Sequence, residues 1–477
     1  MTEPCDLSAV DARQLIGNKQ LSPVELMQSC LKRIETVNPT LNAVVAMDAE
    51  AAMSQAEQDE AAVMQGEDLG LLHGLPVGIK DLESVAGMRT TFGSLLFEQN
   101  IPEADDNSVA NIRASGANIF CKTNTPEFGA GGNTRNRVYG ATGNPFDPEK
   151  TCAGSSGGSA VALASGMVSL AGGSDYGGSL RTPSSFCGVV GFRPSPGVVP
   201  KAGSENSLSP FGVLGPMGRS VADAHLLLQA QAEVNKYDPY SNGDTDHIPE
   251  TLSGIDLGSL RIAVSEDLGC APVDNDIRNV FKQRVQQFGH VFAACDYRDP
   301  YMQDIHETFE ILRCVGWMAG HSEQLQQHRD LLSPNVIDNT SRGMDYSLQD
   351  VFRANVSQTK IYRQFIDLFE EIDILICPSA SVSPFPHSQW SVTEMNGEAM
   401  PTYMTWLTLS YALTTALAAV CTIPCGVDHL GMPFGIQVVG PNGSDAMVLE
   451  VAHSLEQYLA SMPDTARAVA DLTRLKV

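Results

Sequence analysis

The sequence predicts an α/β fold built as one large domain. Short apolar segments bounded by Gly and Pro alternate with longer segments of helical periodicity, which is the pattern of βαβ units. The chain has 477 residues, of which 43% are hydrophobic, and it contains no internal repeat and no long linker. Such a chain can bury one extended core. We therefore expect a single domain over residues 1–477.

The N-terminal part of this domain is expected to be helical. Ser22 has the residue type of a helix N-cap, Pro23 suits the first helical position, and Glu25 completes a capping box. Apolar residues then recur at helical spacing and stop at Asn38, which precedes a proline. The Ala-rich segment Val44–Gln65 predicts a second helix.

Strands and helices alternate after this segment. Val77–Ile79 predicts a short buried strand with Lys80 at its end, flanked by Gly and Pro. Residues 107–116 predict a helix that Asn107 or Ser108 would cap, and Asn118–Lys122 predicts the next strand. Further along we expect a strand at 260–264, a helix at 275–288, strands at 372–377 and 434–439, and a surface loop at 236–251.

Residues 399–427 contain no Asp, Glu, Lys or Arg, which raises the question of a membrane span. Pro401 and Pro424 interrupt the segment, and its apolar run is shorter than the ~20 residues that a span needs. A buried helix followed by a buried strand is expected instead.

The composition narrows the choice of partners and compartment. With 30 basic and 56 acidic residues, the net charge of −26 makes nucleic acid and anionic membrane poor partners. The 11 cysteines show no CxxC pair and no Cys/His cluster with zinc spacing, and the N-terminus has no secretory pattern. We expect a cytoplasmic protein with free thiols, no metal and no cofactor.

Residues 151–197 differ from the rest of the chain, because they hold 11 of the 42 glycines together with packable apolar segments. Glycine at this density indicates close backbone approach, so a structured functional centre is expected. Phosphate binding has no GxxxxGK[ST] string to support it. Residues 154–158 match G-x-S-x-G with Ser156 as nucleophile, although no apolar strand precedes them. A third arrangement is catalytic: Lys80 would act as base for two glycine-flanked serines, Ser155 and Ser179. Judged only by its spacing from these serines, however, Lys80 is expected to be a surface lysine at the end of a strand.

Several long motifs resemble the amidase signature family. They are LHGLPVGIKD (72–81), KTNTPEFGAGGNTRNRVYGATGNPFDP (122–148), CAGSSGGSAVALASGMVSLAGGSDYGGSLRTPSSFCGVVGFRPSPG (152–197), GPMGRSVADAHLLL (215–228) and GMPFGIQVVGP (431–441). The resemblance covers residues 5 to 460 approximately. It implies a large mixed sheet with helices on both faces, a Gly/Ser-rich catalytic core at about 70–220 and substrate-pocket helices at about 300–450.

The resemblance also implies catalytic roles for three residues. Lys80 corresponds to the base, Ser155 to a serine that follows a cis peptide bond and relays protons, and Ser179 to the nucleophile. The backbone N–H groups of Tyr176, Gly177, Gly178 and Ser179 are then expected to form the oxyanion hole.

Other residues are expected around these three. Gly129 corresponds to a substrate-facing loop of the family. We interpret Asp175 and Arg181 as residues that orient the loop through charge-assisted hydrogen bonds. Cys314, Trp317, Tyr403 and Trp406 are candidates for the pocket wall. The chain departs from many relatives at 416–420, where ALAAV replaces a Gly-Leu-Pro-Ala string, and this leaves the pocket shape open.

The sequence thus predicts an amidase that cleaves a small or medium neutral amide to a carboxylate plus ammonia or an amine through an acyl-Ser179 intermediate. Two alternatives stay open. One is the ammonia-generating subunit of a tRNA-dependent amidotransferase, and the other is an inactive protein of the same fold. The expected partner is a small-molecule amide, and a homodimer is plausible.

Overall fold

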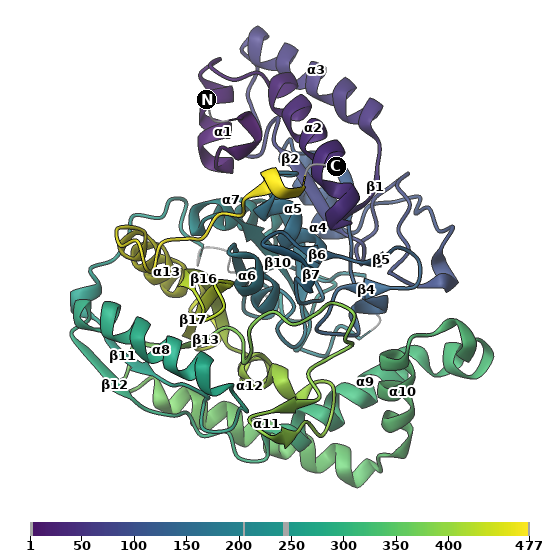
Figure 1. The fold of residues 1–477 in the computed structure, drawn as a ribbon. Helices are drawn as coiled ribbons and strands as arrows, with labels where there is room; N and C mark the ends of the chain where they lie inside the picture. Colours follow the sequence, from purple (N-terminus) through teal and green to yellow (C-terminus); the bar gives the residue numbers. More distant parts are fainter. Residues whose placement is uncertain (1–2, 204–205, 242–247, 476–477) are drawn as a thin grey trace.

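The structure is a computed structural model that describes residues 3–203, 206–241 and 248–475. Its centre is a sheet of 11 strands (Figure 1). These strands are β1 (Val44–Met47), β2 (Pro76–Lys80), β3 (Asn118–Thr123), β8 (Leu170–Asp175), β9 (Val190–Arg193), β10 (Val213–Gly218), β11 (Arg261–Val264), β12 (Ala294–Tyr297), β13 (Ile374–Pro378), β16 (Ala419–Val427) and β17 (Pro433–Gly440).

The sheet is mixed, and its order is β1-β3-β2-β8-β10-β9-β16-β17-β13-β11-β12. β2 is parallel to both β3 and β8, whereas β8, β10, β9, β16, β17 and β13 follow one another in antiparallel pairs. Three two-stranded sheets lie outside it and contain β4 (Arg135–Asn136), β5 (Gly140–Ala141), β6 (Gly143–Asn144), β7 (Asp147–Thr151), β14 (Glu394–Met395) and β15 (Glu398–Ala399).

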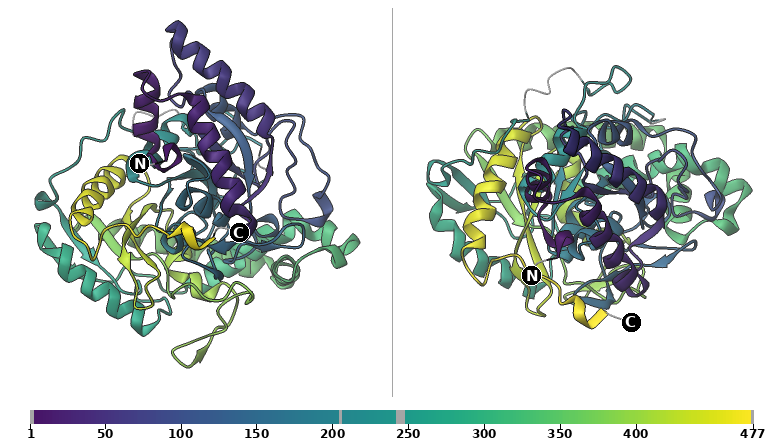
Figure 2. Two further views of the ribbon diagram at one scale, coloured as in Figure 1. Left: turned by 45° about the horizontal axis from the view of Figure 1, so that its top comes forward. Right: turned by 90° about the horizontal axis from the view of Figure 1, so that it is seen from above.

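Helices cover both faces of the sheet (Figure 2). They are α1 (Ala9–Gly17), α2 (Pro23–Leu41), α3 (Ala49–Gln65), α4 (Asn107–Ala114), α5 (Gly157–Ala164), α6 (Arg181–Cys187), α7 (Val221–Gln231), α8 (Asn275–Phe288), α9 (Ile305–Gln327), α10 (Pro334–Asp345), α11 (Leu348–Leu368), α12 (Thr408–Thr415) and α13 (Asp445–Ala460). α9 packs against α10, α11 and α12 beside the sheet. The predicted α/β fold with a large mixed sheet is confirmed.

Most predicted elements are present with small changes at their ends. Ser22 caps α2 and shares a capping box with Glu25, but the helix continues past Asn38 to Leu41, where Asn42 adopts a left-handed conformation. The uncharged segment 399–427 forms a buried helix and then a buried strand, as predicted. Of the predicted loop at 236–251, residues 242–247 lie outside the described residues, and the rest contains no helix or strand.

Two predictions in the N-terminal part are wrong. Residues 44–65 are not one helix, because Val44–Met47 pairs antiparallel with β3 and Asp48 then caps α3 by accepting from the N–H of Ala51. β-Branched residues at the start of this segment favour the strand. The N-cap position of α4 is Asp106 rather than Asn107 or Ser108, and the Asp106 side chain makes no capping hydrogen bond to a described residue.

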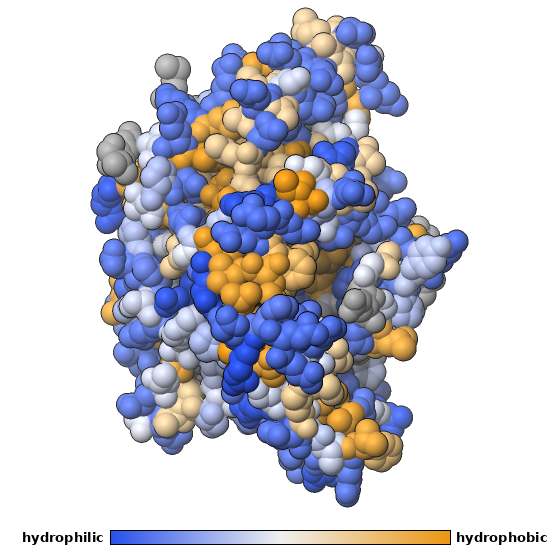
Figure 3. All heavy atoms as spheres, turned by 90° about the vertical axis from the view of Figure 1, so that its right-hand side faces the viewer, coloured by the Kyte–Doolittle hydropathy of each residue, from blue (hydrophilic) through white to orange (hydrophobic). Residues whose placement is uncertain are grey.

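One face of the surface is mostly hydrophilic. Figure 3 shows the face on the right-hand side of Figure 1, where hydrophilic residues predominate and hydrophobic residues gather in separate patches. Within the described ranges, no helix is both long enough and apolar enough to cross a bilayer.

Candidate active site

The topology of the sheet brings Lys80 to the Gly/Ser-rich segment. Lys80 is the last residue of β2, and Asp175 is the last residue of the parallel neighbour β8. The carboxyl ends of parallel strands meet at one edge of a sheet, where binding sites of α/β folds gather. The loop 176–179 that leaves β8 therefore lies beside the lysine.

Lys80 is fully buried and held by serine hydroxyl groups. Its Nζ lies 2.7 Å from Ser155 Oγ and 2.9 Å from both Ser156 Oγ and Ser174 Oγ. Burial disfavours the ammonium form and lowers the pKa of Lys80 to about 7, against the opposing effect of nearby carboxylates. The interpretation of Lys80 as a surface lysine is wrong, and at neutral pH a large share of this amine is uncharged.

Ser155 lies in the turn between β7 and α5. The Gly154–Ser155 peptide bond is cis, as the resemblance implied. A side chain at position 154 would place its Cβ 2.9 Å from the carbonyl oxygen of Gly131, so only glycine fits there. This turn directs the Ser155 hydroxyl toward Lys80 and toward a cavity whose wall includes Ser155. We call it the main cavity because it lies at the candidate site.

Ser179 lies on the wall of the same cavity and is half-buried. Its backbone carbonyl accepts from the N–H of Ser156 at 3.2 Å, which ties its loop to the Ser155 turn. Its hydroxyl makes no hydrogen bond to another described residue. The structure thus joins Lys80 to Ser155 directly and places Ser179 at the cavity, with no direct hydrogen bond from Ser179 to Ser155 among the described residues.

The predicted oxyanion hole needs one correction. The N–H of Gly178 donates to the Asp175 carboxylate at 3.0 Å, so it is not free for an oxyanion in this geometry. Gly178 has a φ of +120°, and a Cβ there would lie 2.5 Å from the Cβ of Ser410. Tyr176, Gly177 and Ser179 line the cavity and stay as candidate donors.

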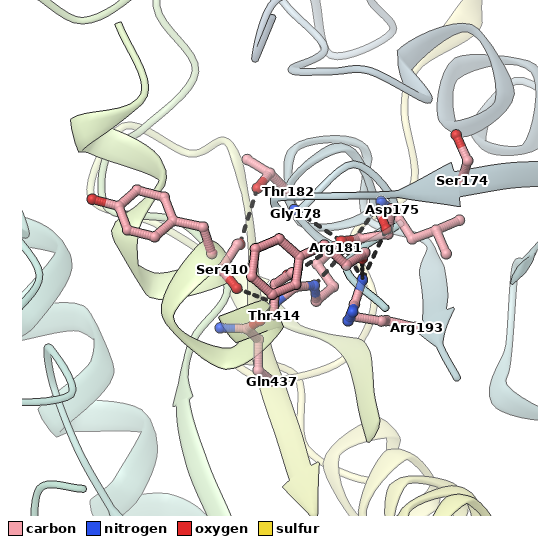
Figure 4. Close-up of polar contacts among 12 residues, drawn as sticks. Ser174, Asp175, Gly178, Arg181, Thr182, Arg193, Ser410, Thr414 and Gln437 are labelled. Atoms are coloured by element: carbon pink, nitrogen blue, oxygen red, sulfur yellow. Dashed lines mark hydrogen bonds and ion pairs between the residues drawn. The ribbon is translucent and has the colours of Figure 1, made fainter. Parts of the chain in front are cut away.

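A buried ion network holds this loop in place (Figure 4). Arg181 binds Asp175 through Nε and Nη2 at 3.0 and 2.8 Å, and Arg193 donates to the same carboxylate at 3.2 Å. Burial disfavours the Asp175 charge, but the two guanidinium groups outweigh this effect and hold its pKa well below its usual range. Arg181 also donates to the carbonyl of Ser410 at 2.8 Å, which anchors the loop to α12. The predicted charge-assisted hydrogen bonds are present.

This network leads to a stability prediction. We expect Asp175→Asn to lower the free energy of unfolding by about 3–5 kcal/mol, because it leaves two buried guanidinium groups without their counter-ion. Urea unfolding followed by circular dichroism measures the change. Glu371→Gln serves as control, since the Glu371–Arg298 pair lies at the surface and its loss should change little. Equal stability of Asp175→Asn and the wild type would contradict the assignment.

The main cavity has a volume of about 350 Å³, which suits a small ligand. Gly129 lines it with a φ of +77°, and a Cβ there would lie 3.4 Å from Ser155 Oγ, so Gly129 lies beside Ser155 at the cavity, and its substrate-facing role stays a prediction. Of the four predicted wall residues, only Trp317 lines this cavity. Cys314 and Tyr403 line a second cavity, and Trp406 is buried in the core against Phe186 and Phe385.

Sequence reasoning missed Ser174, which completes the set of hydroxyls around Lys80. Its only signal in the sequence is its position on β8, directly before Asp175. The geometry also disfavours Ser156 as nucleophile, because the Ser156 hydroxyl is fully buried, bonds to Lys80 and donates to the Ser174 carbonyl at 3.2 Å. A nucleophile must face the substrate, and Ser156 is not among the described residues of the cavity wall.

A buried lysine bound to serine hydroxyls beside a ligand-sized cavity can activate a serine as a nucleophile. The family model described as Amidase matches residues 25–449. The chain therefore belongs to the amidase family, and it is an amide hydrolase of the amidase signature type.

Similar proteins cover almost the whole chain. The acylamidase of Rhodococcus erythropolis is 31% identical over 455 residues, which are 94% of this chain and 95% of the relative. One component of the glutamyl-tRNA(Gln) amidotransferase of Acaryochloris marina is 29% identical, and the match covers 93% of this chain and 96% of that relative. Among solved structures, a bacterial aryl acylamidase superposes with a TM-score of 0.86 at 26% identity and covers 96% of each chain.

Proposed function

We propose that this enzyme cleaves a small or medium amide through an acyl intermediate on Ser179, with Ser155 as proton relay and Lys80 as base. The observation that carries the proposal is the 2.7 Å contact between the buried Lys80 amine and Ser155. A serine hydroxyl is a weak nucleophile until a base removes its proton. Lys80 can act as this base because its pKa is lowered to about 7.

Acylation moves one proton along the three residues. Neutral Lys80 takes the proton of Ser155, which takes the proton of Ser179 as its Oγ attacks the carbonyl carbon. The proton passes from Ser179 to Ser155 either after a rotation of the Ser179 side chain or through a bridging water molecule. The C–N bond breaks when Ser155 gives a proton to the leaving nitrogen and regains one from Lys80. Water then attacks the acyl-Ser179 ester by the same route and releases the carboxylate.

The oxyanion of the tetrahedral intermediate is proposed to meet the N–H groups of Tyr176, Gly177 and Ser179. Removal of one such donor typically costs about 10²–10³ in rate.

The single catalytic domain predicted for residues 1–477 is part of the proposal. Its support is the one sheet that combines strands from both halves of the chain.

An assay over linear, cyclic and aryl amides tests this function. We expect release of a carboxylate together with ammonia or an amine, and faster cleavage of the matching esters because an ester has the better leaving group. Failure to cleave any amide or ester in the panel would contradict the proposal and favour an inactive protein of the same fold.

The pH dependence follows from the lysine. Lys80 acts as base only when neutral, so kcat/KM should rise about tenfold per pH unit below pH 7 and level off above it. Initial rates on a substrate that does not ionise between pH 5 and 9 measure this profile. A rate that is constant from pH 5 to 7 would remove Lys80 as the base.

The ammonia-generating component of an amidotransferase is the second candidate, supported by the similarity to such a protein over 93% of the chain. It predicts glutaminase activity that depends on co-purified partner proteins. We favour the free-standing enzyme, with a small-molecule amide as partner and without nucleic acid, for which the net charge of −26 is unfavourable.

A cytoplasmic location is supported by the 11 free cysteines. The homodimer stays a prediction.

A further inference from the structure

We propose that the substrate is an amide that also carries a carboxylate, and that Arg313 binds this carboxylate. The proposal rests on the function proposed above and narrows it. It departs from the neutral amide that the sequence led us to expect, because the sequence did not place a cation in the cavity. The substrates that fit are short monoamides of dicarboxylic acids without an ammonium group.

Arg313 is a buried cation that faces the active-site cavity. It lies on α9, one turn before Trp317, is 5% exposed and lines both the main cavity and a second cavity of about 200 Å³. Its Nη1 donates to Asn339 Oδ1 and its Nη2 to the Tyr403 hydroxyl at 2.6 Å. Both partners are neutral, and the described residues give Arg313 no ion pair.

The neighbouring arginines are different in this respect. Arg181 and Arg193 bind Asp175, and Arg342 on α10 binds Glu310. A buried charge without a counter-ion is costly. An anion that enters the cavity would supply the counter-ion that the described residues do not give Arg313.

The guanidinium group is also held in a fixed orientation. Its centre lies 5.5 Å from the ring of Trp317 and 5.5 Å from the ring of Tyr403. Asn339 Nδ2 donates to the Tyr403 hydroxyl at 2.6 Å, so the two partners brace each other. Two of the five N–H groups of a guanidinium are used in this way, and the others can meet the two oxygens of a carboxylate.

The charges of the cavity favour an anion over a zwitterion. Lys201 adds a second cation to the wall. Among the described wall residues the only carboxylate is Asp175, and both of its oxygens are taken by arginine and backbone donors. An α-ammonium group, as in glutamine, would find no free carboxylate among the wall residues that the structure describes.

Three substrates of similar size distinguish a preference for a neutral, an anionic or a zwitterionic amide. They are pentanamide, glutaramate, in which a carboxylate replaces the terminal methyl, and glutamine, which adds an α-ammonium group to glutaramate. We expect kcat/KM for glutaramate to exceed that for pentanamide by about 10- to 100-fold, as for hydrogen bonds to a charged group. Glutamine should be cleaved more slowly than glutaramate.

Two variants then test Arg313. Arg313→Gln should reduce kcat/KM for glutaramate about 10- to 100-fold and leave that for pentanamide within about threefold, while Arg313→Lys should keep part of the preference. Arg342→Gln is the matched control, since it removes an arginine from the second cavity only, and it should keep the full preference. Equal losses on both substrates in Arg313→Gln would mean a structural role and overturn the proposal.

Binding distinguishes failure of this inference from failure of the proposed function. Calorimetry on the Ser179→Ala variant needs no turnover, and we expect it to detect glutaramate but only weak binding of pentanamide. Equal affinities for the two would overturn the anionic substrate even if amides are cleaved. Preferential binding of glutaramate, without cleavage of any amide by the wild type, would keep the Arg313 site and contradict the catalytic proposal alone.

Discussion

Replacement of Ser179 by Ala is expected to lower kcat by about 10⁴- to 10⁶-fold, the range found when a nucleophilic serine is removed from a hydrolase. The fold should survive, because the Ser179 hydroxyl makes no hydrogen bond to another described residue and is only half-buried. Steady-state hydrolysis of the best amide of the panel measures the loss, and thermal unfolding verifies that the melting temperature is unchanged.

Ser156→Ala is the matched control for this experiment. Ser156 is the alternative nucleophile, and the structure buries it against Lys80 and the Ser174 carbonyl. The variant should lose much less activity than Ser179→Ala and should still be labelled by a fluorophosphonate. If Ser156→Ala abolished labelling while Ser179→Ala retained it, the nucleophile would have been assigned to the wrong serine.

Replacement of Lys80 by Met is expected to lower kcat/KM by about 10²- to 10⁴-fold, which is the usual contribution of a general base. Methionine fills most of the volume of the buried lysine but cannot accept a proton from Ser155. The rise of the rate between pH 5 and 7 should disappear with the amine. Initial rates across this pH range, divided by the fraction of folded enzyme, provide the measurement.

Lys122 offers a control, because it is a second buried lysine on the neighbouring strand β3. Burial lowers its pKa to about 8, and its Nζ lies 4.0 Å from Asp81 and donates to the Glu83 carbonyl. Lys122→Met should destabilise the fold, since it leaves a buried carboxylate without its partner, and should keep the activity per folded molecule within about threefold. If Lys80→Met kept its activity to the same degree, Lys80 would not be the base.

The sequence predicted the elements whose signals are local. The capping box of Ser22 and Glu25 placed the start of α2 correctly, and the uncharged segment 399–427 was interpreted correctly as a helix and a strand. The prediction for Val44–Gln65 was wrong, because the strand at its start exists only through pairing with β3. Local propensity carries no information about such a partner.

The site also combines features with a local signal in the sequence and features that depend on contacts between distant segments. The motifs named Lys80, Ser155 and Ser179, but the burial that lowers the pKa of Lys80 depends on strands that are distant in the sequence. Arg313 could not be found in this way, since its role follows from the absence of an ion-pair partner among the described residues around it. Trp317 was predicted as a wall residue, whereas Trp406 packs in the core, and a tryptophan looks the same in both places from the sequence.

The most direct test of the catalytic assignment is the position of the covalent intermediate. A reaction with an activated ester is quenched during turnover, digested with trypsin and analysed by mass spectrometry. Ser155, Ser156 and Ser179 share the tryptic peptide 151–181, so fragmentation must localise the acyl group within it. We predict the acyl group on Ser179. An acyl group on Ser155 or Ser156, or turnover without any acylated peptide, would contradict the mechanism.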